Sequence, residues 1–445
     1  MSQPININAE TNSMYIFQGN RFLEYIEPIE IKKVIKEKTG FEEQDGEGFG
    51  EYYKRFLTEK ASEAEILERE FFESIFYGRL TNVFINKIKN EPVTEAIFKQ
   101  AVKRLIDDMN SRNTLPPDVK RLMKEDGFYI MDLVNTTEKN TFLAGFDYST
   151  ANGYVDKSRF LITHVVPTKT DADRTVIKYL VCAIEIDYTK KTLVAALKNI
   201  PNIVNEDENG EIDEGIQKTV VQAYKKFLKL FENHLQIQKF IKVKKDRRAM
   251  FEMCEKLDNT MLYDLREEIE LKNSDTFKTM VSTLTEELFG KAIAPIVKQD
   301  NLVKRFKSLL LATYLDVMTE DDNLIYIAKS SKLVGYPTRV AFQSSNSLKG
   351  ATGTSGASEP VATSVMFHSL YTDFQEALEL PKWALSWFTD INHLTDSTEV
   401  IQTSVVSMKE NFKVTFINKN HIGKELFQHV IGELSQCRDY EEGDE

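Results

Sequence analysis

Five segments rich in Val, Ile, Phe, Tyr and Thr follow one another between Gly127 and Leu197, joined by short polar links. Short connections favour antiparallel neighbours, because parallel strands need long crossovers. No segment of helical length interrupts the series, which argues against alternating strands and helices of the Rossmann type. The series predicts an antiparallel meander whose strands lie at residues 128–134, 142–148, 159–166, 175–188 and 192–197.

Helical patterns stand on both sides of this meander. Apolar residues recur every four positions in two rows, which predict one core helix running to about Ile88: Leu67, Phe71 and Ile75, and Phe72, Phe76, Leu80, Phe84 and Ile88. A second helix is expected from Pro92 to about Met109. After the acidic segment 205–214, a similar row from Ile216 to Leu235 begins a long helical stretch.

Strand-like segments return near residue 323. We expect strands at residues 324–328, 339–343, 364–370, 403–408 and 411–417, and a helix at residues 422–435. Trp383 and Trp387 stand four apart, a spacing found in helices. The predicted fold class is α+β: an antiparallel β-sheet covered by helices, a long central helical segment, and a second β-containing C-terminal part.

This pattern divides the chain into four parts. Residues 1–204 hold the first helices and the sheet, residues 205–320 are mainly helical, and residues 321–438 form a C-terminal α+β part. Residues 439–445 hold five acids and form an acidic tail.

Composition limits the classes of protein that fit. With 42% hydrophobic and 28% charged residues the chain is not wholly disordered, and its net charge of −12 argues against indiscriminate coating of nucleic acid. No apolar run reaches 18 residues, so we expect no membrane partner. Three widely spaced cysteines and the lack of a signal-like N-terminus favour a cytoplasmic location. Gly350, Gly353 and Gly356 lack the lysine of a P-loop, and no cofactor is expected.

A basic stretch at residues 224–248 stands out in this acidic chain. It holds nine lysines and arginines against two acids, so it carries +7 while the rest of the chain carries −19. The candidate phosphate-contacting side chains are Lys239, Lys242, Lys244, Lys245, Arg247 and Arg248. The alternative is a solvated helix face whose lysines pair with acids elsewhere in the fold.

Four carboxylates flank or occupy one predicted strand. Asp171 and Asp173 precede it, and Glu185 and Asp187 share a face because strand residues two apart point the same way. Four such groups at one place could hold Mg²⁺ for phosphodiester cleavage. The acid-then-E-x-K pattern of restriction-like nucleases is absent, since Asp187 occupies the lysine position, and the alternative is a strand end with solvated acids.

The order of elements resembles the bacterial nucleoid-associated, NdpA-like family. Local likenesses lie in FYIMDLVNTTEKNTFLAGFDY (128–148), VVQAYKKFLKLFENH (220–234) and NFKVTFINKNHIGKEL (411–426), and together the resemblance covers about half of the chain. The family implies association with DNA. No functional residue is carried over from it.

The first functional hypothesis is a non-catalytic, cytosolic bacterial protein that associates with DNA through the basic stretch. The second is a protein-interaction component of a phage-defence or phage-encoded system, with residues 344–360 and the acidic tail as contact elements. The third is a Mg²⁺-dependent nuclease. A homo-oligomer is compatible with each of them.

Overall fold

The computed structural model confirms an α+β fold with a large antiparallel sheet. It describes residues 18–112, 120, 123–129, 141–170, 174–201, 203, 205–206, 212–213, 220–318, 321–343, 349–353, 358–417 and 421–438. The segment expected as a first strand, residues 14–17, and the acidic tail lie outside these ranges.

The helices of the described residues are α1 (Pro28–Thr39), α2 (Phe49–Glu59), α3 (Ala64–Tyr77), α4 (Glu95–Arg112), α6 (Val220–His234), α7 (Val243–Met261), α8 (Tyr263–Phe289), α9 (Gln299–Met318), α10 (Asp321–Ser330), α11 (Val365–Ser369), α12 (Tyr371–Ala377) and α13 (Lys424–Gln436). Short 3-10 turns are η1 (Gln18–Tyr25), η2 (Ala61–Glu63), η3 (Ala294–Ile296) and η4 (Val361–Thr363). The strands are β1 (Asn82–Ile88), β2 (Val93–Thr94), β3 (Phe128–Tyr129), β4 (Thr141–Ala151), β5 (Tyr154–Lys169), β6 (Thr175–Asp187), β7 (Thr192–Leu197), β8 (Asn205–Glu206), β9 (Ile212–Asp213), β10 (Lys239–Phe240), β11 (Gly335–Gln343), β12 (Lys349–Gly353), β13 (Lys382–Phe388), β14 (Val400–Ser407) and β15 (Phe412–Phe416).

The predicted meander is present in the described residues, while residues 130–134 of its first predicted strand lie outside them. Strands β3 to β7 pair in chain order, each antiparallel to the next. The β5–β6 hairpin is the longest, with an unbroken register from Lys157 opposite Asp187 to Lys169 opposite Thr175. Short links allow this order, as the sequence indicates.

The helix expected to reach Ile88 is wrong beyond Tyr77. Helix α3 ends there, and residues 82–88 form strand β1. Gly78 makes the sharp exit: a Cβ at this position would stand 2.4 Å from the carbonyl oxygen of Ser74 and 2.8 Å from that of Tyr25. The first five residues of β1 are all buried, the apolar Val83, Phe84 and Ile85 as well as Asn82 and Asn86, because both faces of the strand are covered.

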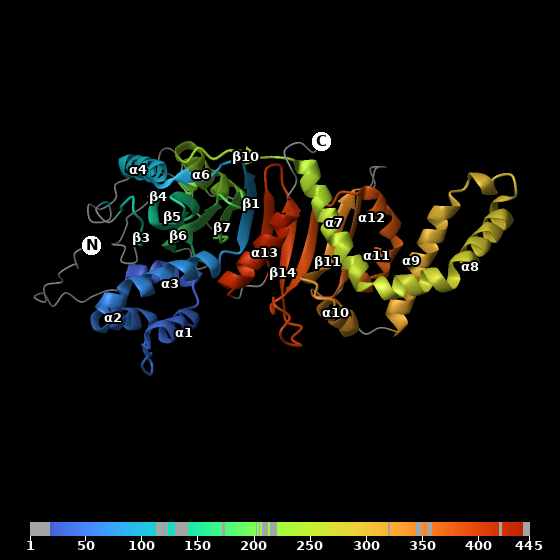
Figure 1. The fold of residues 1–445 in the computed structure, drawn as a ribbon, viewed down its shortest axis with the longest axis horizontal. Coiled ribbons are helices and arrows are strands. Elements are labelled where there is room, and N and C mark those ends of the chain that lie inside the picture. The colour runs from blue at the N-terminus through green and yellow to red at the C-terminus, as the bar shows by residue number, and fades with distance from the viewer. Residues whose placement is uncertain are drawn as a thin grey trace, which may run out of the picture.

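Strand β1 joins the two β-containing parts of the chain. It pairs with β7 on one side and with β15 on the other, so the described strands form one sheet in the order β12-β11-β13-β14-β15-β1-β7-β6-β5-β4-β3. In this sheet β10 also pairs with β1, and β2 with β5. Figure 1 shows the sheet running along the long axis of the molecule as far as the base of α8 and α9.

Three expectations for the C-terminal part are wrong. Residues 324–328 lie in helix α10, and residues 364–370 contain helix α11. Trp383 and Trp387 lie on strand β13, where a spacing of four also puts two side chains on one face. Within residues 344–360, strand β12 pairs with β11, and residues 344–348 and 354–357 lie outside the described ranges.

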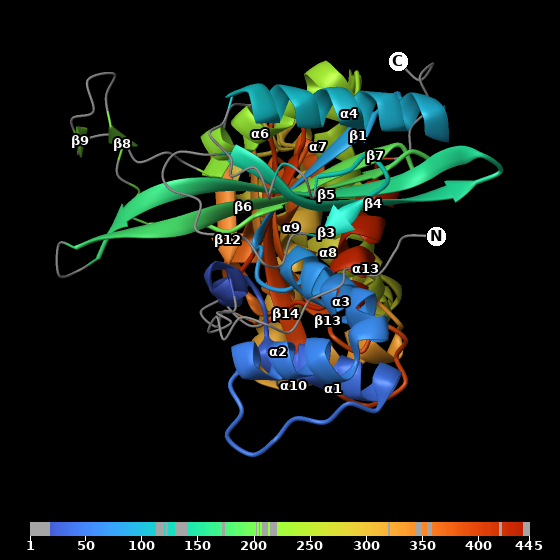
Figure 2. The same cartoon turned by 90° about the vertical axis from the view of Figure 1, so that its left-hand side faces the viewer.

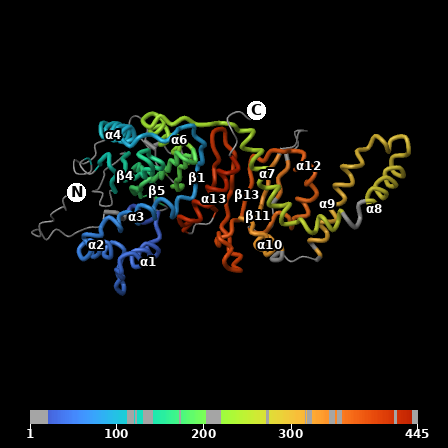
Figure 3. Tube along the Cα trace, viewed as in Figure 1, coloured from blue at the N-terminus to red at the C-terminus, as the bar shows by residue number. Residues whose placement is uncertain are grey.

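Helices cover both faces of the sheet. In Figure 2, α4 and α6 lie on one side of β4, β5 and β6, and α1, α2 and α3 lie on the other. Helix α13 packs with α3 and β1 on the second side. Helices α8 and α9 project from the end of the molecule that lies away from α1, α2, α3 and α4 (Figure 3).

Candidate nucleic-acid interface

Backbone pairing gathers lysines from three distant segments at the C-terminal end of β1, a central strand of the sheet. Strand β10 pairs with the end of β1, so that Lys87 faces Phe240, and Lys87 faces Thr192 of β7 on its other side. The amide of Ile88 donates to the carbonyl of Lys191 at 2.8 Å. We call the following residues the lysine cluster: Lys87, Lys89, Lys190, Lys191, Lys239, Lys242 and Lys244.

The ring of Phe240 lies among these lysines. The ammonium groups of Lys89 and Lys242 stand 5.3 and 5.7 Å from its centre, a cation–π geometry. Lys89, Lys190 and Lys244 are exposed. These three lysines therefore present positive charge to solvent near the buried ring of Phe240. Lys191 is paired with Glu91 at 2.6 Å, and Lys87 donates to the carbonyl of Arg438 at 2.5 Å.

Helix α7 begins within the cluster. The N-cap residue is Lys242, whose side chain makes no capping hydrogen bond to the backbone amides of the first turn. Asp246, the acid of this turn, points inward and pairs with Arg438. The positive end of the helix dipole thus adds to the lysine charge.

Some of the predicted phosphate-contacting residues have acidic partners. Lys239, with 15% of its side chain exposed, bridges Glu232 at 2.6 Å and Glu410 at 2.8 Å. Burial lowers the Lys239 pKa, but these two hydrogen-bonded carboxylates outweigh it and the net shift is upward. Lys239 is therefore paired with acids of the fold, which is the alternative to a phosphate contact for this residue.

The two arginines of the stretch also have acidic neighbours. Arg247 stands 3.9 Å from Glu379, and Arg248 stands 2.9 Å from Glu252, one helical turn on. The Arg248 pair is exposed on both sides, and such pairs contribute little because water screens them. Arg248 can therefore exchange its carboxylate for a phosphate. Lys245 is half-buried at the base of the same turn.

A cleft of about 530 Å³ opens beside the cluster, between α13 and the ends of β1, β5, β6 and β7. Four lysines and two acids lie in its wall: Lys87, Lys157, Lys190, Lys191, Glu185 and Asp187. The α13 side supplies Phe427, Gln428, Ile431, Gly432, Ser435 and Gln436. Its volume falls in the range of small-molecule sites, and its charged groups are mainly positive.

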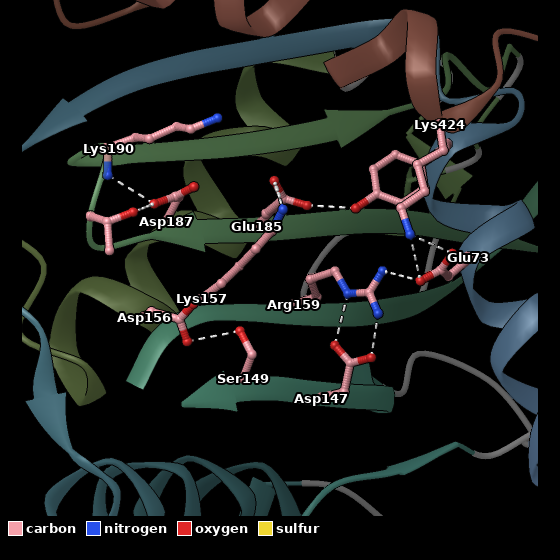
Figure 4. A network of polar contacts seen from close by, with 12 residues as sticks. Glu73, Asp147, Ser149, Asp156, Lys157, Arg159, Glu185, Asp187, Lys190 and Lys424 are labelled. Atoms are coloured by element: carbon pink, nitrogen blue, oxygen red, sulfur yellow. Dashed lines mark hydrogen bonds and ion pairs between the residues drawn. The ribbon is translucent and has the colours of Figure 1, made fainter. Parts of the chain in front are cut away.

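Glu185 and Asp187 share one face of β6, as predicted (Figure 4). Glu185 is buried and accepts hydrogen bonds from the Tyr77 hydroxyl at 2.6 Å and the Lys157 ammonium at 2.8 Å. Burial, and then the Glu185 charge, raise the pKa of Tyr77. Asp187 accepts from the Thr189 hydroxyl at 2.7 Å and from the Lys190 amide at 2.8 Å.

The other two predicted acids, Asp171 and Asp173, lie outside the described residues. Strand β6 begins at Thr175, about 33 Å from Glu185 along an extended strand. Within the described ranges, no three His, Cys, Asp or Glu side chains form a group suited to a metal ion.

A second charged network stands next to the cleft (Figure 4). Arg159 donates to Glu73 at 2.7 Å and to Asp147 at 2.8 Å, and Lys424 donates to Glu73 at 2.8 Å. Burial raises the Glu73 pKa, but Lys424 and Arg159 outweigh it and the net shift is downward. The network ties α3, β4, β5 and α13 together.

Sequence reasoning found the contiguous half of the cluster and missed Lys87, Lys89, Lys190 and Lys191. The two lysines of the β6–β7 turn stand three and four residues after Asp187, in the short link between two predicted strands, so the hairpin prediction contains a signal for them. Lys87 and Lys89 had none, because residues up to Ile88 were expected to be helical.

Comparison with family models, with curated proteins and with solved structures finds no match to this chain. The resemblance to the NdpA-like family stays a prediction. Among the described helices, none combines the length and the apolar character needed to cross a membrane.

Proposed function

We propose that this chain is a cytoplasmic bacterial protein that associates with DNA, without catalysis, through phosphate contacts at the lysine cluster. The observation that carries the proposal is the convergence of three segments, the end of β1, the β6–β7 turn and β10 with the start of α7. Ammonium groups that contact phosphates carry little sequence information, so the association is expected to be largely independent of DNA sequence.

The accessible members of the cluster have the direct role in this proposal. Lys89, Lys190, Lys242 and Lys244 are exposed or half-exposed, and the first turn of α7 adds its amides. Lys239 supports the surface by holding α6, β10 and the β14–β15 turn together through Glu232 and Glu410. The net charge of −12 on the whole chain confines attraction of DNA to this place.

The test is DNA binding by fluorescence anisotropy over a salt series. We compare the wild type with a triple variant, Lys190→Glu, Lys242→Glu and Lys244→Glu. The control makes the same charge change at exposed positions of α1 and α4: Lys33→Glu, Lys103→Glu and Arg104→Glu. Each lost phosphate contact lowers the slope of log affinity against log salt by about 0.9.

The expected result is binding by the wild type and the control, with reduced affinity and slope in the triple variant. Equal loss in the control and the cluster variant would mean that net charge alone matters. No binding at low salt would refute the proposal.

A second candidate, a protein-interaction component of a phage-defence or phage-encoded system, is favoured by a different observation. Helices α8 and α9 expose large apolar side chains far from the lysine cluster. The segments first assigned to this role give it no support, since β12 occupies part of residues 344–360 and the acidic tail lies outside the described residues. A variant with charged residues in place of the exposed apolar residues of α8 and α9 tests this candidate. DNA association should be unchanged in this variant, whereas binding of a protein partner should be lost.

A further inference from the structure

Helices α8 and α9, with the turn η3 between them, form an arm that projects beyond the sheet (Figures 1 and 3). Its large apolar side chains are unusually exposed, with Leu288 at 74%, Ile296 at 78% and Val317 at 71%. The other members of this apolar surface are Met280, Leu284, Phe289, Ile293, Phe306, Leu309, Leu310 and Tyr314.

Helix α9 is apolar on two opposite sides. Leu311, Ala312 and Leu315 are buried on the side that packs against α8, α11 and α12. At 100° per residue, a second apolar face lies on the other side of the helix and consists of Phe306, Leu309, Leu310, Tyr314 and Val317. Apolar residues on two opposite sides of a helix are typical of a helix that packs between two partners.

Helix α8 adds a matching row. Met280, Leu284 and Leu288 recur every four residues and are exposed, beside buried Val281 and Thr285. The arm is thus folded upon itself and still presents apolar rows on both helices. Ile293 and Ile296 extend this surface over the tip.

The size of the surface fits a stable dimer. With about 150–250 Å² on a fully exposed large side chain, the exposed fractions correspond to roughly 1,000 Å² per copy. A standard interface buries about 800 Å² on each partner. The largest apolar patch of a typical monomer is only about 300–600 Å².

The charges of the arm complement one another. Helix α8 carries seven acidic and three basic side chains, while α9 carries three basic and two acidic ones. The connection between them adds Lys291 and Lys298, both exposed. Within one copy Lys307 already pairs with Glu270 of α8, and Arg305 pairs with Asp373. A second copy placed with its α9 along α8 therefore offers the exposed Lys304, Lys291 and Lys298 to the acidic surface of α8, and twofold symmetry repeats this contact.

We infer that the arm binds the arm of a second copy of this chain. In the dimer, α8 of each copy lies along α9 of the other, and the four helices enclose the apolar rows. In each copy the lysine cluster lies outside the arm, near the middle of the long axis (Figure 1). A dimer therefore presents two DNA-contacting surfaces, although the arm contact itself does not depend on DNA.

The test is the mass of the full chain in solution, measured by sedimentation velocity at concentrations from about 0.5 to 50 µM. The concentration is varied because the fraction of dimer depends on it. We compare the wild type with the double variants Leu310→Glu with Val317→Glu in α9, and Leu284→Glu with Leu288→Glu in α8. These positions are exposed, so the variants keep the monomer fold, which circular dichroism checks. The control is Ile97→Glu with Leu394→Glu, two exposed apolar residues outside the arm.

We expect the wild type and the control at twice the chain mass of 51.2 kDa, and both arm variants shifted to the monomer with dissociation constants raised at least about tenfold. A wild type that stays monomeric at 50 µM would overturn the inference. The arm would then be a surface for a different protein. A dimer that persists in both arm variants would place the interface elsewhere and overturn it too.

Discussion

Arg438 and Asp246, 192 residues apart, form a buried two-point ion pair. The distances are 2.9 Å from Nε to Oδ1 and 3.1 Å from Nη2 to Oδ2, and Arg438 is 2% exposed. The same guanidinium donates to the carbonyl of Ile85 at 2.9 Å and stands 4.6 Å from the ring of Phe412. One side chain thus connects the end of α13 and the start of α7 to strands β1 and β15.

Replacing Arg438 by Ala is expected to lower the free energy of unfolding by about 3–5 kcal/mol, because it removes the guanidinium that holds the buried Asp246 carboxylate at two points. Urea denaturation measures this loss. Arg248→Ala, which breaks the exposed pair with Glu252, serves as the control and is expected to cost less than about 1 kcal/mol. Equal effects of the two substitutions would contradict the assigned role of the buried pair.

Substitution of Lys239 is expected to affect mainly the stability of the fold, and substitution of Lys244 mainly DNA binding. Lys239→Ala removes the bridge between Glu232 and Glu410 and should lower stability by about 1–3 kcal/mol. Lys244→Ala changes an exposed side chain, so it should alter stability by at most about 0.5 kcal/mol while weakening DNA binding. Denaturation and anisotropy on both variants check this separation. A stable Lys239→Ala protein would show that the bridge is not structural.

The hydroxyl of Tyr77 is expected to stabilise the fold through Glu185. Tyr77→Phe removes one of the two hydrogen bonds to a buried carboxylate and should lower the free energy of unfolding by about 1–3 kcal/mol. Tyr154→Phe, at an exposed tyrosine of β5, is the matched control and should change nothing measurable. Thermal unfolding of both variants provides the comparison.

The carboxylate of Glu185 already accepts hydrogen bonds from Tyr77 and Lys157, and that of Asp187 accepts one from the amide of Lys190 in the β6–β7 turn. Because both carboxylates are engaged in these contacts, we expect no Mg²⁺-dependent nicking of plasmid. Agarose electrophoresis after incubation with Mg²⁺ or Mn²⁺ is the measurement. Nicking by the wild type that Glu185→Ala abolishes would restore the nuclease hypothesis and displace the non-catalytic one.

Acidification is expected to destabilise the fold through His368. Burial lowers the pKa of this imidazole, and its Nε2 donates to the carbonyl of Ala362 at 2.7 Å. Because the folded-state pKa lies below the unfolded value of about 6.5, the unfolded chain binds more protons as pH falls through that value. The stabilisation is thus full above about pH 6.5 and is lost toward the lower, folded-state pKa. Urea denaturation from pH 7.5 to 5.5 should show a smaller decrease in His368→Gln than in the wild type.

The sequence predicted the meander because its links are too short for any other arrangement. It misled at β1, where Phe84 and Ile88 continue the four-residue rows of α3 although Gly78 has ended the helix. A strand covered on both faces lacks the alternation that marks a strand at the surface. A spacing of four is shared by helices and strands, which explains the error at Trp383 and Trp387.

The candidate site was predictable only where its charge is contiguous. Residues 239–248 appear as a basic run, whereas Lys87 and Lys190 join them through the pairing of β10 with β1 and of β1 with β7. The inward orientation of Asp246 depends on Arg438, almost 200 residues later. Contacts of that separation leave no local pattern in the sequence.

The place of β1 in the sheet has a consequence for synthesis of the chain. Its partner β15 is more than 300 residues downstream, so one side of β1 has no β15 to pair with while the ribosome makes most of the protein. An open strand side of this kind attracts other strands, and domains made early fold first. The nascent chain is therefore expected to depend on chaperones, or on slow translation, until residues 412–416 emerge and complete the sheet.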